Sequence, residues 1–137
     1  MSHLSSYKNN SLKNTDDSLL RQTLEEIGLQ IDFDKKKIKT DSWSWKEADV
    51  DAVLMQNGKD LPIGLKFNRS ENGDKEVEII GDFYGTGLRQ EQLTNQLAQY
   101  YQKNHIISKC EEQGWYVDQN SIREVDGEIV FQAERWA

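Results

Sequence analysis

Cysteine, proline and histidine are scarce in this sequence of 137 residues, and long apolar runs are absent. The single Cys110 has no partner for an internal disulfide, and its place on an apolar helical stripe is typical of a buried, inert thiol. No run reaches the roughly 18 apolar residues of a membrane-spanning helix. The polar start, residues 1–8, lacks the apolar stretch of a signal peptide. We therefore expect a soluble protein that is not exported.

Basic residues are also few relative to acidic ones. The chain has 17 Lys and Arg against 24 Asp and Glu, a net charge of −7. Nucleic-acid backbones and anionic membranes both require a basic face. We therefore expect a protein partner and no nucleic acid, and any peripheral membrane association would be through that partner.

Length and composition favour one domain, preceded by a polar arm. Residues 1–15 are rich in Ser, Asn and Lys and show no period, so we predict an arm that is ordered only if the domain or a partner holds it. Residues 16–137 are predicted to form a single α+β domain, and the hydrophobic content of 36% is enough for one core.

A long helix is predicted over residues 89–113. Its apolar positions recur at helical spacing, with a polar gap at Asn104, whereas Ala98 and Gln102 are expected on the opposite face. About 24 residues give a rod of roughly 36 Å, long enough to cross four or five strands. A shorter helix is predicted to begin near residues 16–18 and to end at Gly28. The apolar stripe of the long helix consists of Leu93, Leu97, Tyr100, Tyr101, Ile107 and Cys110.

Alternating apolar residues predict strands around residues 29–33, 38–40, 50–54, 63–67 and 77–79, and again from Trp115 onward. Asn-Gly pairs at residues 57–58 and 72–73 and an Asp-Gly pair at 126–127 predict hairpin turns. Ile129, Phe131 and Ala133 are predicted to lie in one final strand. We predict an antiparallel sheet of about five to seven strands, with one long and one short helix packed on one face.

No pattern of catalytic or metal-binding residues stands out. Gly81, Gly85 and Gly87 precede the long helix, but the segment lacks the Lys-Ser/Thr of a phosphate loop, and Asp82 would repel phosphate. His3 and His105 have no companion ligands at suitable spacing. We therefore predict no catalytic residue, no metal site and no cofactor.

Aromatic residues are the stronger signal. Trp43, Trp45, Phe83 and Tyr84 lie in irregular stretches, where core packing and contact with a partner are equally compatible with the sequence. We take these four as candidate partner-binding residues. Trp115 and Phe67 lie within regular strands and are expected in the core.

Short segments along nearly the whole chain resemble the hypothetical chloroplast reading frame thirty-five family, which cyanobacteria and algal plastid genomes carry. The resemblance implies the cyanobacterial cytoplasm or the plastid stroma as a setting, and no activity, because members of that family are uncharacterised. The chain departs from the family pattern around residues 43–45 and 83–87. The matching segments are MSHLS at 1–5, EIG at 26–28, ADV at 48–50, IGLKFN at 63–68, QLAQYYQKNH at 96–105, QGW at 113–115 and ERWA at 134–137.

Two functions are compatible with this pattern. The first is a non-enzymatic protein-binding or assembly module of the photosynthetic compartment, whose acidic surface favours a partner with a basic rim. The alternative is a small-molecule or cofactor-handling protein that binds its ligand on the open side of the sheet. A pocket with convergent polar groups would favour the alternative, and an exposed aromatic patch over a solid core would favour the first.

Overall fold

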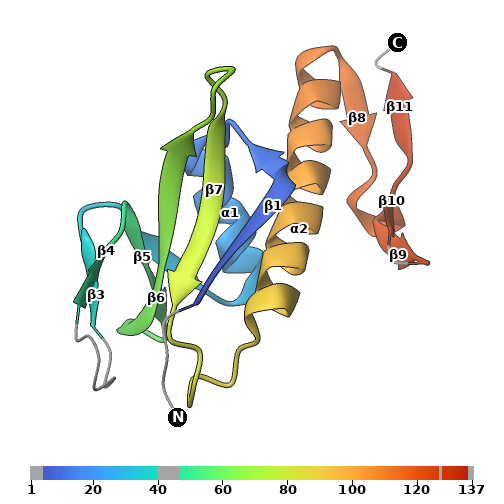
Figure 1. Cartoon of the computed structure of the whole chain (residues 1–137). Helices are drawn as coiled ribbons and strands as arrows, with labels where there is room; N and C mark the ends of the chain where they lie inside the picture. Colours follow the sequence, from blue (N-terminus) through green and yellow to red (C-terminus); the bar gives the residue numbers. More distant parts are fainter. Residues whose placement is uncertain (1–4, 40–46, 127, 136–137) are drawn as a thin grey trace.

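A curled antiparallel sheet with two helices on one face forms the centre of the molecule (Figure 1). The computed structural model describes residues 5–39, 47–126 and 128–135. The sheet has five strands in the order β1-β7-β6-β5-β2. This arrangement confirms the predicted α+β class. The strands are β1 (Ser5–Lys13), β2 (Gln30–Asp32), β5 (Ala52–Gln56), β6 (Lys59–Arg69) and β7 (Lys75–Gly81).

The meander of β5, β6 and β7 follows the predicted alternation. Asn57 and Gly58 join β5 to β6 with φ angles of 54° and 76°, the positive values that a tight hairpin of type I′ requires. Gly64 in β6 marks a close approach of two segments, because a Cβ there would lie 2.6 Å from Val50 Cγ1 and 2.8 Å from the carbonyl oxygen of Ala52. A side chain at that position would force the neighbouring backbone to move.

Strand β1 was not predicted. It pairs antiparallel with β7, from Ser5 opposite Gly81 to Lys13 opposite Glu76, and Leu12 is buried in the core with 1% of its surface exposed. Residues 5–13, which the sequence predicts as part of a polar arm, therefore form an edge strand of the sheet. This strand was not predictable, because its sequence has almost no apolar alternation.

Both predicted helices are present with nearly the predicted limits. Helix α1 (Asp17–Ile27) begins after Asp16, whose carboxylate accepts a hydrogen bond from the Leu19 amide at 2.9 Å. It ends at Gly28, whose φ of 92° closes the helix in the left-handed conformation. Helix α2 is Gln90–Glu112.

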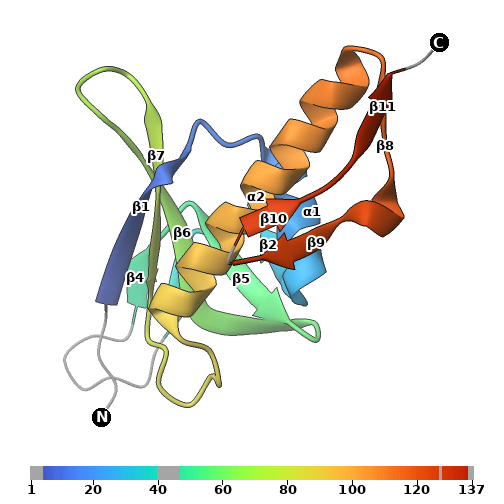
Figure 2. The same cartoon turned by 90° about the vertical axis from the view of Figure 1, so that its right-hand side faces the viewer.

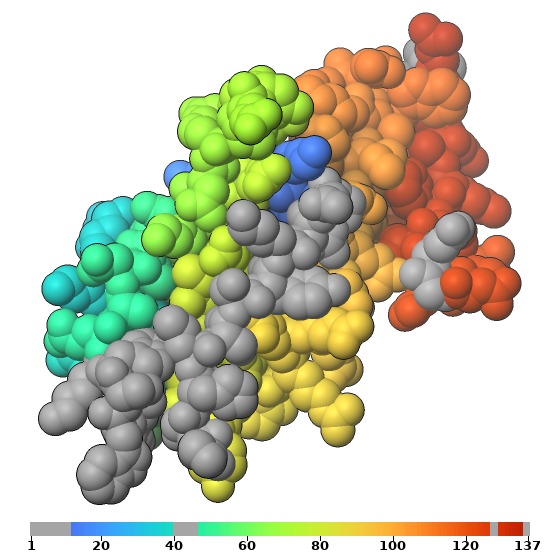
Figure 3. Space-filling view, viewed as in Figure 1, coloured from blue at the N-terminus to red at the C-terminus, as the bar shows by residue number. Residues whose placement is uncertain are grey.

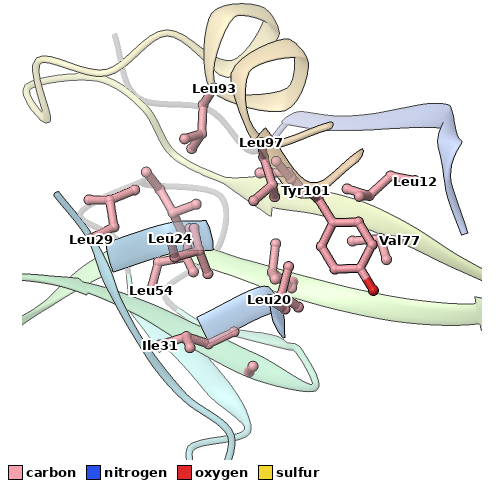
Figure 4. Packing of buried hydrophobic residues seen from close by; sticks show 14 of the residues in the cluster. Leu12, Leu20, Leu24, Leu29, Ile31, Leu54, Val77, Leu93, Leu97 and Tyr101 are labelled. Carbon is pink, nitrogen blue, oxygen red and sulfur yellow. The ribbon is translucent and has the colours of Figure 1, made fainter. Parts of the chain in front are cut away.

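Leucines from the two helices point toward one another over the sheet, with Tyr101 of α2 beside them (Figure 4). Each described strand of the sheet contributes at least one side chain to this core, so a single apolar cluster joins the sheet to both helices. The buried members are Leu12, Leu20, Leu24, Leu29, Ile31, Ala52, Leu54, Ile63, Leu65, Val77, Ile79, Leu93, Leu97, Ala98 and Tyr101.

The buried face of α2 differs in part from the predicted stripe. Ala98, predicted on the outer face, is buried with 4% exposure, and the polar Asn104 is buried with 5%. Asn104 Nδ2 donates to Thr23 Oγ1 at 3.0 Å and to Glu26 Oε2 at 3.2 Å, which ties α2 to α1. Leu93, Leu97 and Tyr101 are buried as predicted. The remaining stripe residues are only half-buried: Tyr100, Ile107 and Cys110.

A short hairpin covers part of the opposite face of the sheet. It consists of β3 (Lys37–Lys39) and β4 (Glu47–Asp49), and it contacts β5 and β6. Ile38 of the hairpin packs with Val53 and Ile80, which point away from the helices, and this smaller core also includes Val50. The sheet is thus buried on its helical face and partly buried on the other.

The C-terminal residues form a further layer on the far side of α2 (Figures 1, 2 and 3). Two ribbons of two strands each lie there, and β8 and β10 contact α2. The prediction of one final strand through Ile129, Phe131 and Ala133 is wrong, because the chain leaves strand geometry at residues 131–132 and so forms two strands. Trp115, predicted in the core, is half-buried. The elements are β8 (Trp115–Val117), the 3-10 turn η1 (Gln119–Ser121), β9 (Arg123–Val125), β10 (Glu128–Val130) and β11 (Ala133–Arg135).

Among the described residues, neither helix is long and apolar enough to cross a membrane.

Candidate functional site

A cavity of about 750 Å³ opens beside the exposed side chain of Tyr84. It lies on the face of the sheet opposite the helices, between the β3–β4 hairpin, the start of β6 and the loop that follows β7. We call it the Tyr84 recess. It is lined by Lys37, Ile38, Lys39, Val53, Asp60, Leu61, Pro62, Asp82, Tyr84 and Gly85.

A second, smaller cavity of about 450 Å³ adjoins the Tyr84 recess. The two cavities share the segment from Asp60 to Pro62 and the dipeptide Tyr84-Gly85. Tyr84 therefore stands where the two hollows meet, with 70% of its surface exposed. An aromatic ring at such a place offers a large contact area to a partner.

The loop from β7 to α2 holds Tyr84 in this position through its own hydrogen bonds. The Asp82 amide donates to the Pro62 carbonyl at 2.9 Å, and Asp82 Oδ1 accepts from the Tyr84 amide at 3.2 Å. Thr86 Oγ1 donates to the Phe83 carbonyl at 2.7 Å. Gly85, with a φ of 78°, makes the turn that leaves Tyr84 at the surface.

The two neighbouring aromatic residues of this loop point to different environments. Phe83 is half-buried and packs against the main core, whereas Tyr84 is exposed at the recess. Phe83 thereby anchors the loop from which Tyr84 projects. Trp43 and Trp45, the other two candidate partner-binding residues, lie outside the described residues, which stop at Lys39 on the wall of the recess and resume at Glu47.

Charges of both signs line the recess. Lys37 Nζ lies 3.7 Å from Glu47 and 4.0 Å from Asp49, so the charge of Lys37 is partly balanced on the hairpin itself. Lys35 Nζ contacts both carboxylate oxygens of Asp60, at 2.8 and 2.9 Å. The hydrogen bond to Asp60 raises the pKa of Lys35 above its ordinary value of 10.5, and partial desolvation opposes this.

Metal-binding side chains do not gather in the part of the chain that the structure describes. No three His, Cys, Asp or Glu side chains in that part are placed to hold a metal ion. The ring of His105 stacks on Tyr101, with 6.2 Å between ring centroids and 13° between planes, on the helical side of the sheet. Cys110 is half-buried rather than fully buried.

Another hollow of about 700 Å³ runs along the first half of α2 near β9. Its lining is mostly amide and charged side chains, and it contains no exposed large apolar residue. It therefore offers less apolar contact area than the Tyr84 recess. It is lined by Arg89, Glu91, Gln92, Asn95, Gln96, Gln99, Tyr100 and Glu124.

Tyr84 was a candidate from the sequence, whereas the other residues that line the recess were not. Asp60, Leu61 and Ile38 carry no signal of their own, since the recess arises only when the β3–β4 hairpin folds onto the sheet. One residue of the lining does give a hint in the sequence, because Asp82 is a carboxylate in a glycine-containing loop, where it would repel phosphate.

A family model described as a protein of unknown function (DUF1257) matches residues 23–131. No curated protein and no solved structure matches the chain.

Proposed function

The chain belongs to the family of proteins of unknown function DUF1257, and we propose that it is a non-enzymatic binding module that holds another protein at the Tyr84 recess. The observation that carries this proposal is the 70% exposure of Tyr84 at the edge of a cavity of about 750 Å³. A large aromatic side chain gains most from burial when a partner covers it. The apolar lining residues of the recess include the half-buried Leu61 and Pro62.

We further propose that the module acts in the photosynthetic compartment, in the plastid stroma or the cyanobacterial cytoplasm. The support is the resemblance of its short segments to the hypothetical chloroplast reading frame thirty-five family. The partner would then be a protein or a complex of the photosynthetic apparatus. Tyr84 contacts this partner, Phe83 anchors the loop, and Trp43 and Trp45, which follow the recess residue Lys39 in the chain, extend the contact surface.

The test is recovery of a partner by the tagged chain from cyanobacterial or algal plastid extracts in mild detergent, read by mass spectrometry. Tyr84→Ala should reduce recovery of the partner at least tenfold and leave the melting temperature nearly unchanged, because the side chain is exposed. Tyr116→Ala is the matched control. Tyr116 is 53% exposed on β8, beyond α2 and away from the recess.

Equal recovery by wild type, Tyr84→Ala and Tyr116→Ala would contradict the proposed site. The double variant Trp43→Ala and Trp45→Ala extends the same test to the other candidates. If these tryptophans belong to the contact surface, the double variant should fold normally and lose the partner. Collapse of its fold would show that they belong to the core.

The second candidate function is binding of a small molecule, as a ligand or cofactor, in the same recess. The observation that favours it is the size of the cavity, which falls within the roughly 300–1,000 Å³ of small-molecule sites and combines apolar and charged walls. Native mass spectrometry of the chain purified from a photosynthetic host tests this. A stoichiometric mass increment that Lys39→Trp, at an exposed position of the lining, abolishes would support a ligand in the recess. A chain without bound ligand under mild ionisation would contradict this function.

A further inference from the structure

Two exposed hairpin turns contain the dipeptide Asn-Gly, at residues 57–58 and 72–73. In this dipeptide the backbone nitrogen of glycine can attack the side-chain carbonyl carbon, Cγ, of the preceding asparagine, because glycine has no side chain in the way. The nitrogen–Cγ bond forms, the Cγ–Nδ2 bond breaks, and Nδ2 leaves as ammonia with the proton of the glycine amide. Water then adds to either carbonyl carbon of the succinimide ring and returns a proton to the nitrogen, which gives aspartate or isoaspartate.

The side-chain oxygen of Asn72 is surrounded by donors. Negative charge develops on this Oδ1 atom when the glycine nitrogen attacks. The Ser70 hydroxyl donates to Asn72 Oδ1, and the Asp74 amide donates to it at 3.4 Å. Donors already aimed at the atom that becomes an oxyanion stabilise the transition state more than the ground state. The loop therefore favours attack on Asn72.

The loop also keeps these donors in place while the ring forms. The Ser70 amide donates to the Asp74 carbonyl at 2.9 Å, which closes a loop of three residues. The Gly73 amide donates to the Ser70 carbonyl at 3.0 Å, and this is the one bond of the loop that has to open before attack. Asn72 and Gly73 are exposed, so water and base reach them.

The turn at Asn57 lacks both advantages. Among the described residues, no donor contacts Asn57 Oδ1. Asn57 has a φ of 54°, and in this left-handed conformation, with ψ near about 47°, the next nitrogen lies almost opposite Cβ about the Cα–C bond. Although the Gly58 amide is held only by a long bond of 3.5 Å to Gln30 Oε1, ring closure requires the two-residue turn to unfold.

We propose that Asn72 is a modification site, which converts spontaneously to aspartate and isoaspartate in the folded protein while Asn57 is retained. The product places a carboxylate beside Glu71 and Asp74, and isoaspartate adds one methylene to the backbone of the loop. Asp74 Oδ1 accepts a hydrogen bond from Asn14 Nδ2 at 3.1 Å, so the altered loop adjoins the end of β1.

The first test follows both asparagines in one sample. The full chain is incubated in mildly alkaline heavy-oxygen water and digested, and the peptides are separated and weighed by mass spectrometry. Asn72 should convert at least about tenfold faster than Asn57, because it has the donors and the accessible backbone. Equal rates, faster conversion of Asn57, or no conversion of Asn72 over the period in which a free peptide of residues 68–76 converts would overturn the proposal.

The second test removes one donor. Ser70→Ala deletes the hydroxyl that donates to Asn72 Oδ1, so conversion of Asn72 should slow about fivefold, the rate factor that corresponds to one net hydrogen bond. Ser70→Thr keeps a hydroxyl at this position and is the matched control, which should convert at nearly the wild-type rate. Conversion of Asn57, on the other hairpin, should be unchanged in both variants. If Ser70→Ala converts at the wild-type rate or faster, the proposed role of the loop is wrong.

Discussion

Tyr101 is buried in the main core, is hydrogen-bonded to the beginning of α1 and has a raised pKa. Its hydroxyl oxygen accepts a hydrogen bond from the Asp16 amide at 2.7 Å, at the beginning of α1, and the residue is only 6% exposed. Burial raises the pKa of the Tyr101 phenol above its ordinary value of 10.0, although the hydrogen bond from the Asp16 amide acts in the opposite direction. The negative charges of Asp16 and Asp17 raise it further.

This shift predicts a loss of stability in alkali. Above about pH 10 the tyrosine of the unfolded chain ionises while the folded Tyr101 keeps its proton, so the unfolded state binds fewer protons and the free energy of unfolding falls as pH rises. Tyr101→Phe removes this titration. At neutral pH the variant should be less stable by about 1 kcal/mol, because the hydrogen bond is lost. Urea unfolding from about pH 8 to about pH 11 should show this difference shrinking above pH 10. A difference that stays constant would contradict the assignment.

At the scale of elements, the helices and strands with a regular apolar pattern were predictable from the sequence. The features that depend on contacts between residues far apart in the chain were not. Helices α1 and α2 and the meander of β5 to β7 have apolar periods and turn residues of their own, and they were placed correctly. Strand β1 has no such period, and only its pairing with β7 makes it a strand. The sequence predicts Asn104 as a polar interruption of the apolar stripe of α2. Its burial was not predictable, because its hydrogen-bond partners Thr23 and Glu26 lie about eighty residues earlier in the chain.

The packing of α2 on the sheet predicts the cost of removing one side chain. Leu97 is fully buried at 0% exposure, in contact with the main core. Leu97→Ala should lower the free energy of unfolding by about 2–5 kcal/mol, from lost apolar burial and the cavity left behind. Gln102→Ala, on the exposed side of the same helix, is the control and should change it by less than ~0.5 kcal/mol. A loss below ~1 kcal/mol for Leu97→Ala in denaturant melts would place this residue outside the core.

At the scale of the whole molecule, the two sides of the sheet have different roles. The helical side is filled by the main core and continues through α2 to the C-terminal ribbons. Among the residues that the structure describes, the β3–β4 hairpin lies on the opposite side, which contains the Tyr84 recess. Tyr84 was a candidate from sequence because it is an aromatic residue in an irregular loop. The recess was not predictable, because it is formed by four segments that are brought together only by the fold of the sheet.

The charge of the whole molecule predicts how association with the proposed partner depends on salt. A chain with a net charge of −7 attracts a basic partner surface over a distance set by the Debye length, which falls from roughly 30 Å at 0.01 M to about 10 Å at 0.1 M salt. The association rate should therefore fall at least tenfold between about 0.01 M and about 0.5 M salt, because the steering is screened. The dissociation rate should change much less, since it depends on contacts already formed.

Stopped-flow association of the isolated partner with the full chain measures both rates. Tyr84→Ala should raise the dissociation rate and leave the salt dependence of the association rate unchanged, because it removes a contact and no charge. An association rate that is independent of salt, or that rises with it, would show that long-range charge attraction does not guide this encounter.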